Sequence, residues 1–224
     1  MSRIIVTGAA SGLGREIWNV LKEQGHTVFS YDSEYGQDVL KPEKGLINYA
    51  YPDILINCAG VNKIAWFDKV DDALWDEVME VNVKGILKMS QACLPYLKRN
   101  NGTILNIVSN AAHVPMRCSA AYNASKGAAY ILTKQMAREL SSEGITVFSV
   151  SPNKLKGTKM SDNIDRQVCE TRGWTMGQAK DYQLSSLLTG EETPPRMVAE
   201  FIAFLLQDKE HHKYLTGCDL PYGA

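Results

Sequence analysis

The sequence predicts a doubly wound α/β fold, in which a parallel sheet lies between two layers of helices. Short apolar runs rich in β-branched residues recur along the chain, and longer helical patterns separate them. The 224 residues, 45% hydrophobic and 22% charged, suffice for one large domain that needs no disulfide or metal. Because no linker or repeat divides the chain, we predict a single domain over residues 1–224 with three layers, α/β/α.

The predicted strands are uninterrupted apolar runs, as expected for parallel strands buried on both faces. They are residues 4–6, 27–31, 54–56, 103–108 and 146–150. We predict helices at about 12–24, 72–98, 121–142 and 195–207. Gly25 and Gly144 stand where the first and third of these helices should end.

Two segments interrupt the alternation of strands and helices. Residues 33–52 form a short connection with little clear helix, and residues 153–195 are polar and irregular. A long irregular insert in a regular domain is often a lid or a binding segment. We therefore predict a substrate-binding insert at about 153–195, the alternative being a solvated surface excursion.

Charge and composition exclude several classes of partner. With 24 basic and 25 acidic residues the net charge is −1, so no positive field favours nucleic acid or an anionic membrane. No apolar run reaches the length of a membrane span, and the N-terminal run is too short for a signal peptide. The five scattered cysteines form no CxxC, and the four histidines lack metal-ligand spacing. We expect a cytoplasmic protein without a metal site.

A glycine-rich loop, residues 7–14, follows the first predicted strand and opens the first helix. Gly8 can turn the chain sharply, Gly12 lets the backbone approach a pyrophosphate, and Gly14 lets the helix pack closely on the sheet. The free N–H groups of the helix start then favour the phosphates of a dinucleotide. The residues assigned to cofactor binding in this loop are Thr7, Gly8, Ser11, Gly12, Leu13 and Gly14.

Asp32 ends the second predicted strand, 18 residues after Gly14. An acidic group at this place accepts hydrogen bonds from the ribose hydroxyls of NAD and repels the 2′-phosphate of NADP. The next residue is Ser33, and Ser11 in the loop is also uncharged, so no cation offsets the carboxylate. The sequence therefore favours NAD as the cofactor.

These motifs and four later ones resemble the classical short-chain dehydrogenase/reductase family. The loop matches that family's TGxxxGxG. The later motifs follow in the family's order: Asn57-Cys58-Ala59-Gly60 resembles NNAG, Asn82 the helix Asn, Ser109 the catalytic Ser, and Tyr122 with Lys126 YxxxK. The resemblance covers almost the whole chain and implies a Rossmann-type fold.

The resemblance implies further cofactor contacts. Asp38 and Val39 resemble the pair that contacts adenine, although the connection from Asp32 to Ile54 is shorter than usual, as if a helix were trimmed away. Asn153 stands where the family usually has a glycine. Asn57 is expected chiefly to brace the end of its strand. The further cofactor residues assigned in this way are Asp38, Val39, Asn57, Ala59, Gly60, Tyr122, Lys126, Pro152, Asn153 and Leu155.

The spacing of Tyr122 and Lys126 places both on one face of a helix. An ammonium group near the phenol is expected to lower its pKa from about 10, so that Tyr122 can exchange a proton with a carbonyl or alcohol oxygen. Ser109 can hold the same oxygen. By resemblance, Lys126 also binds the nicotinamide ribose, and Asn82 helps to hold a water that links Lys126 to solvent.

The sequence thus predicts an oxidoreductase that transfers hydride between NAD(H) and a small secondary alcohol or ketone. Two alternatives stay open: an NADP-dependent 3-oxoacyl thioester reductase, and a non-catalytic dinucleotide-binding protein. His113 and Arg117 are the candidates for substrate contact. Arg117 and three lysines of the insert either meet an anionic substrate or are solvated: Lys154, Lys156 and Lys159.

The family forms dimers and tetramers, so a homodimer or homotetramer is expected. The helices about 72–98 and 121–142 resemble those that pair between subunits. Their apolar residues also fit simple packing on the sheet, and the sequence does not separate the two.

Overall fold

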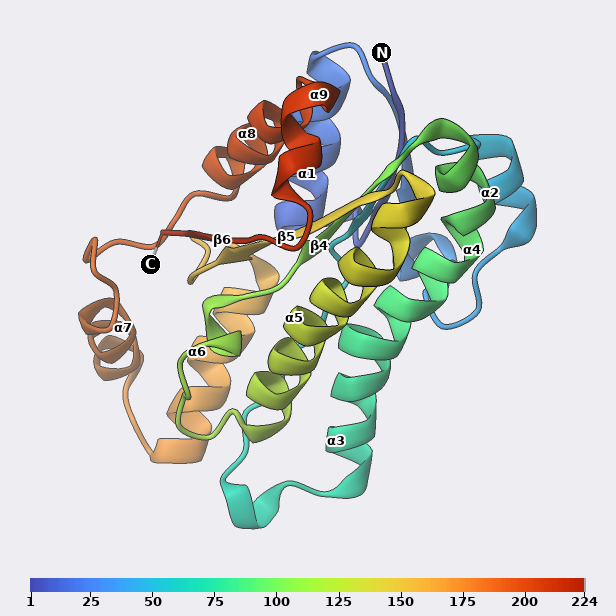
Figure 1. Ribbon diagram of the computed structural model, residues 1–224. Helices are drawn as coiled ribbons and strands as arrows, with labels where there is room; N and C mark the ends of the chain where they lie inside the picture. The colour runs from blue at the N-terminus through green and yellow to red at the C-terminus, as the bar shows by residue number, and fades with distance from the viewer. Residues whose placement is uncertain (224) are drawn as a thin grey trace.

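Six strands pair in parallel in the computed structural model of the protein, which describes residues 1–223 (Figure 1). Their order across the sheet is β2-β1-β3-β4-β5-β6. The strands are β1 (Arg3–Thr7), β2 (Thr27–Tyr31), β3 (Ile54–Asn57), β4 (Thr103–Ile107), β5 (Thr146–Pro152) and β6 (Asp219–Tyr222). The predicted doubly wound parallel sheet is confirmed, with five strands close to their expected places.

The sixth strand, β6, was not among the predicted strands. It is only four residues long, begins with an aspartate and contains Pro221. A proline cannot donate to a strand ladder, so it is tolerated at the edge of a sheet, which is where β6 lies. Its pairing with β5 therefore depends on tertiary context, because its own residues carry a weak strand signal.

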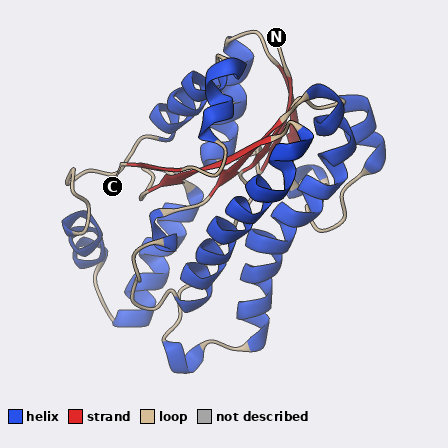
Figure 2. Cartoon of the chain, viewed as in Figure 1, coloured by secondary structure: helices blue, strands red, loops and turns tan. Residues whose placement is uncertain are grey.

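Helices cover both faces of the sheet (Figure 2). One layer contains α1 (Gly12–Glu23) and α8 (Pro195–Leu206), with the short α9 (Lys209–His212) beside it. The other contains α2 (Lys44–Ala50), α4 (Gly85–Asn100) and α5 (Ala120–Leu140). Successive residues of β1 serve alternate layers: Ile4 and Val6 belong to the first core, Ile5 to the second. All three are completely buried, which explains why the strand reads as an unbroken apolar run.

The long helix predicted at about 72–98 contains a break in its hydrogen-bond pattern. It begins as α3 (Asp72–Met79), passes through a π-helical turn at Glu80–Lys84, and continues as α4 to Asn100. Such turns are rare and occur mostly at functional sites. The buried residue of this turn is Asn82.

The insert at 153–195 is helical in part, so the expectation of an irregular segment is wrong. It contains α6 (Lys159–Arg172) and α7 (Met176–Ser185), which lie beyond the end of β5 in Figure 1. Side-chain caps start both helices: Thr158 accepts from the Ser161 N–H, and Thr175 forms a capping box with Gln178. Few apolar residues mark these helices, because each buries only a narrow face.

The shortened connection after β2 holds one 3-10 turn, Ser33–Tyr35, and then the seven-residue α2.

Within residues 1–223, no helix combines the length and the apolar character needed to cross a lipid bilayer.

Candidate active site

A cavity of about 610 Å³ opens at the carboxyl ends of the strands. The chain leaves β1 for β2 on one side and returns to β3 on the other, and ligands of open α/β sheets bind at such a reversal. The predicted site residues that line the cavity are Gly8, Ser11, Gly12, Leu13, Gly14, Asp32, Asp38, Val39, Ala59, Gly60, Ser109, Arg117, Tyr122, Lys126, Pro152, Asn153 and Leu155.

Thr7 and Asn57 lie beside the cavity, but their side chains bond within the protein. The Thr7 hydroxyl accepts from the backbone N–H groups of Cys58 and Ala59, at 2.9 and 3.0 Å. The Asn57 amide donates to the Asn106 side chain at 2.9 Å. Both side chains therefore brace the protein beside the cavity, as was expected of Asn57, while the assignment of Thr7 to cofactor binding stays a prediction.

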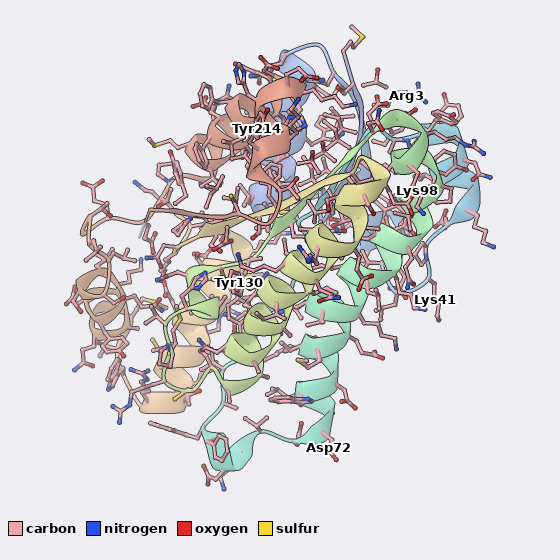
Figure 3. The ribbon with its side chains drawn as sticks, in the orientation of Figure 1. Arg3, Lys41, Asp72, Lys98, Tyr130 and Tyr214 are labelled. Atoms are coloured by element: carbon pink, nitrogen blue, oxygen red, sulfur yellow. The ribbon has the colours of Figure 1, made fainter. Side chains whose placement is uncertain are left out.

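His113 does not line the cavity, which corrects its assignment to the substrate wall. Its Nε2 lies 2.9 Å from a carboxylate oxygen of Asp219, and its ring packs edge-on against that of Tyr130. Figure 3 labels Tyr130 on α5. Asp219 is the first residue of β6 and also accepts from the hydroxyls of Ser149 and Ser151. The strand that the sequence did not reveal thus provides the partner of His113.

Two glycines of the loop, Gly8 and Gly14, are packed so closely that a side chain would not fit there. A Cβ atom on Gly14 would lie 2.1 Å from the carbonyl oxygen of Gly8, and one on Gly8 would lie 2.8 Å from Ala59 Cα. Gly8 also has φ of +69°, in the left-handed region. Ser11 caps α1 without a side-chain hydrogen bond, and the first turn contains no acidic residue. The N-terminus of α1 is therefore left available for an anionic group.

Asp32 is held rigidly at one end of the cavity. Its carboxylate accepts from the backbone N–H groups of Ala10 and Glu34, both at 2.9 Å, and the residue is 8% exposed. Glu34 and Asp38 line the same end, which is accordingly acidic. Lys159 of α6 pairs with Glu34 at 3.2 Å, but both side chains are exposed, so the pair contributes little.

Ser109, Tyr122 and Lys126 meet in the middle of the cavity. Ser109 follows β4, and its hydroxyl forms a hydrogen bond with the phenol of Tyr122 in the first turn of α5. Lys126 lies one helical turn later, with its Nζ 5.8 Å from the centre of the Tyr122 ring. Its ammonium donates to the carbonyl oxygen of Ile107 at 3.0 Å.

Burial controls the titration of these groups, contrary to expectation. It raises the pKa of Tyr122 above its usual value, and the hydrogen bond from Ser109 opposes that rise only in part. Burial also lowers the pKa of Lys126 to about 8, because the ammonium has lost its hydration. The predicted lowering of the Tyr122 pKa by Lys126 is therefore wrong for this arrangement, in which desolvation dominates.

Burial of Lys126 should destabilise the fold near neutral pH. Its pKa is about 8 in the fold and 10.5 in the unfolded chain, so below pH 8 it is charged in both states and the folded state bears the full desolvation cost. That cost disappears as the pH rises from 8 to 10.5. We expect Lys126→Met to raise the free energy of unfolding by about 2 kcal/mol at pH 7, and the gain to vanish near pH 10.5.

Urea unfolding from pH 6 to pH 10.5 measures this gain. Lys44→Met removes the same charge from an exposed position at the start of α2 and serves as the control. An equal gain for Lys126→Met at pH 7 and pH 10.5 would contradict the desolvation argument.

Asn82 connects three parts of the site. Its side-chain oxygen accepts from the Val61 N–H, and its amide donates to the Val61 carbonyl and to the Ser125 hydroxyl, each at 2.9 Å. Ser125 in turn donates to the Tyr122 carbonyl at 2.8 Å. The π-helical turn, the loop after β3 and the first turn of α5 are thus held together. Ser125 was not singled out in the sequence, although it lies between Tyr122 and Lys126 and is completely buried.

The insert forms the outer wall of the cavity, which argues against a solvated excursion. Ile164, Val168 and Arg172 of α6 line it, as do Tyr182 and Gln183 of α7. Two contacts hold α6 to the loop after β3. The Gln167 side chain accepts from the Ile64 N–H at 2.8 Å, and the Trp66 indole donates to the Thr171 carbonyl at 2.9 Å.

Of the three lysines considered above as contacts for an anionic substrate, two are paired with acidic side chains. Lys154 is buried and forms ion pairs with Asp165 and with Glu192, the second at 3.2 Å. Lys159 pairs with Glu34. Lys156 lies outside the main cavity. The lysines of the insert therefore offer no free charge to a ligand in this cavity.

Comparison with known proteins agrees with this arrangement. The family model described as short chain dehydrogenase matches residues 46–168. The 3-oxoacyl-(acyl-carrier-protein) reductase FabG of Thermotoga maritima is 28% identical over 95% of this chain and 92% of its own length. The reductase of the same name from Staphylococcus aureus is 30% identical over 95% of this chain and 93% of its own.

Solved structures of reductases and dehydrogenases are also similar to this chain. A variant of actinorhodin polyketide ketoreductase with NADPH has a TM-score of 0.85 at 26% identity, covering 97% of this chain and 94% of its own. The aldohexose dehydrogenase of Thermoplasma acidophilum has a TM-score of 0.83, covering 97% and 91%. Its identity is 23%, so it supports the fold alone.

Proposed function

The chain belongs to the short-chain dehydrogenase family, and on that premise we propose that it transfers hydride between NAD(H) and a secondary alcohol or ketone. Enzymes of this family are NAD(P)-dependent oxidoreductases that act on CH–OH and ketone groups. One observation carries the proposal for this chain. Ser109, Tyr122 and Lys126 line the same cavity as the glycine loop and Asp32.

The residues present fit a dinucleotide. Gly12 and Gly14 carry no side chain and Ser11 does not cap the helix, so the first N–H groups of α1 would hold the pyrophosphate. Asp38 and Val39 would border the adenine, and Pro152, Asn153 and Leu155 the nicotinamide. When bound, the nicotinamide supplies or accepts the hydride.

The side chains of the protein would bind the substrate oxygen and move its proton. Ser109 would donate a hydrogen bond to that oxygen and stabilise the charge that develops on it. Tyr122 would give it a proton during reduction or remove one during oxidation. Because burial raises the pKa of Tyr122, the phenol keeps its proton at neutral pH and is ready to act as the donor. Asn82 would act as a positioning residue, because its side chain donates a hydrogen bond to Ser125 and does not line the cavity.

Asp32 is the basis for proposing NAD in preference to NADP. Its fixed carboxylate would accept hydrogen bonds from the ribose hydroxyls, and the 2′-phosphate of NADP would meet a like charge there. We expect NADH to bind about 100-fold more tightly than NADPH, because a few kcal/mol of repulsion separate the two. Asp32→Ser should remove most of this difference.

Separate titrations of NADH and NADPH, followed by the shift in Tm, measure this preference. Asp72→Ser removes the same charge from the start of α3, far from the sheet (Figure 3), and should leave the preference unchanged. Tighter binding of NADPH by the parent protein would refute the role of Asp32.

A second candidate function comes from the relatives. Their names, and the NADPH bound to the ketoreductase, favour an NADP-dependent reductase of 3-oxoacyl thioesters. Stabilisation by NADPH together with reduction of a 3-oxobutanoyl thioester would support that candidate. Binding of NADH without turnover of any alcohol or ketone would instead support a non-catalytic dinucleotide-binding protein.

The proposal also covers the domain organisation, the assembly and the cellular location of the enzyme. We propose one domain over residues 1–224 with a substrate-binding insert at about 153–195, assembled as a homodimer or homotetramer in the cytoplasm. Ile131 of α5 is 60% exposed and Leu87 of α4 is 37% exposed, so these helices can pair between copies. The five cysteines are free, which suits a reducing compartment. Light scattering on the purified protein tests the assembly, and the mass of a single chain would refute it.

A further inference from the structure

The outer wall of the cavity contains an arginine whose charge is unmatched. Arg172 ends α6 and lines the cavity. Its Nε and Nη1 atoms are covered by protein and have no hydrogen-bond partner, and the guanidinium makes no ion pair with any residue from 1 to 223. An arginine that loses its hydration is ordinarily paired with a carboxylate or phosphate. The site is therefore incomplete as it stands.

Two aromatic rings hold the guanidinium in place. Its central carbon lies 4.6 Å from the centre of the Trp174 ring and 4.5 Å from that of Tyr182. The two rings contact each other edge-on at 5.2 Å. Stacking of this kind retains part of the lost hydration energy and fixes the direction of the charge before a ligand arrives.

The charges that line the cavity are divided between its two ends. Every carboxylate in its lining comes from the loop after β2: Asp32, Glu34 and Asp38. The substrate wall has Arg172 from α6 and Arg117 from the loop before α5, and neither makes an ion pair within residues 1–223. The end with the three carboxylates, one of which pairs with Lys159, favours an anion less than the end with the two arginines.

A second unpartnered polar atom lies in the same lining. The side-chain oxygen of Asn62 is covered by protein and has no hydrogen-bond partner in the described part of the chain. The surroundings are otherwise apolar, with Ile164 and Val168 of α6 and Leu187 after α7. The Asn62 oxygen accepts hydrogen bonds, so it requires a donor such as a hydroxyl group on the ligand, whereas Arg172 requires an anion. A ligand that satisfies this wall has an apolar body, a negatively charged end and a hydroxyl group.

We propose that Arg172 binds a carboxylate of the substrate, remote from the reacting carbon, and that the substrate is a hydroxy acid or its oxo acid. The inference rests on the proposed hydride transfer at Tyr122. An aliphatic chain between the two functional groups would lie along the apolar wall. Arg117, at the exposed side, would add to the attraction without being covered. Arg172 thus determines specificity and takes no part in moving the proton.

The test compares acids with their methyl esters, which differ from the acids at the distal end by the loss of the charge and the gain of one methyl group. We would measure kcat/KM with NAD for 3-hydroxybutanoate, 4-hydroxypentanoate and 5-hydroxyhexanoate, and for the three methyl esters. The parent enzyme should prefer the acid at the chain length that spans the cavity. Arg172→Gln should lower the ratio of acid to ester by roughly 10- to 100-fold, as expected for a hydrogen bond to a charged group. Arg172→Lys should restore part of the ratio.

A matched control comes from the same helix. Arg166 is exposed on α6 and does not line the cavity, so Arg166→Gln removes an equal charge without touching the proposed contact. Its ratio of acid to ester should equal that of the parent. A ratio near one in the parent, or an equal loss in both variants, overturns the proposal.

A failure of the proposed hydride transfer can be distinguished from a failure of the carboxylate site, because turnover and binding are measured separately. If neither acids nor esters turn over, the shift in Tm caused by each acid in the presence of NADH still reports binding. A shift that Arg172→Gln abolishes supports the carboxylate site without hydride transfer, and no shift for any acid overturns it. Phosphopantetheine and pantetheine thioesters of 3-oxobutanoate form a further pair. Dependence on Arg172 only for the phosphorylated member assigns the arginine to phosphate and overturns the carboxylate.

Discussion

Replacement of Tyr122 by phenylalanine is expected to lower kcat at least about 1000-fold, because general acid–base catalysis by a positioned group contributes on this scale. The substitution removes the phenol oxygen that forms a hydrogen bond with Ser109. It keeps the ring, which lines the cavity with its centre 5.8 Å from the Lys126 Nζ. Binding of NADH, followed by the shift in Tm, should change far less than kcat.

The matched control for this variant is Tyr130→Phe. Tyr130 lies on the same helix (Figure 3), two turns further along, and contacts His113 outside the cavity. This variant should keep kcat within a factor of about two, since it alters no group at the reacting atoms. If Tyr122→Phe kept more than a tenth of the parent kcat, another group would have to supply the proton.

Gly14→Ala is the substitution with the largest expected effect on stability. The new Cβ would lie 2.1 Å from the Gly8 carbonyl oxygen and 2.7 Å from its carbon. Both atoms belong to the backbone, so α1 has to move away from the glycine loop. We expect a loss of about 3 kcal/mol, which for a chain of this size lowers Tm by roughly 6–12 °C, together with loss of NADH binding.

Gly127→Ala provides the control for this experiment. Gly127 lies in α5, and a Cβ placed there has no neighbour within 4 Å. Since alanine is the better helix former by about 1 kcal/mol, this variant should be as stable as the parent or more so. Thermal unfolding of both variants, with and without NADH, measures the contrast. Normal stability and NADH binding in Gly14→Ala would show that the loop can rearrange at little cost.

The central strands and the glycine loop could be predicted because their signals are carried by residues that are neighbours in the sequence. An unbroken apolar run such as Ile4-Ile5-Val6 reveals a strand with two buried faces, and both faces are indeed buried. The glycine loop could be recognised from the sequence because a predicted strand precedes it and a predicted helix follows it. The helices of the insert were missed because their signal lies in the caps, Thr158 and Thr175, and not in an apolar stripe.

The candidate site was predicted unevenly for a similar reason. Residues that lie at the ends of strands, such as Asp32 and Ser109, line the cavity because the carboxyl ends of parallel strands meet at one edge. His113 was misplaced, since its partner Asp219 lies 106 residues away on a strand with a weak signal. The raised pKa of Tyr122 was also missed, because desolvation depends on all the elements that enclose the phenol.

Local sequence therefore determined the class of fold, the phosphate-binding turn and the set of groups for proton transfer. Each of these follows from residue types and their order and spacing along the chain. The tertiary structure alone decided which charges are free. Lys154 is neutralised by Asp165 and Glu192, whereas the Arg172 guanidinium lies against two aromatic rings and makes no ion pair within residues 1–223. Pairing of this kind depends on distances between segments that are remote in the chain, and spacing along the sequence carries no information about them.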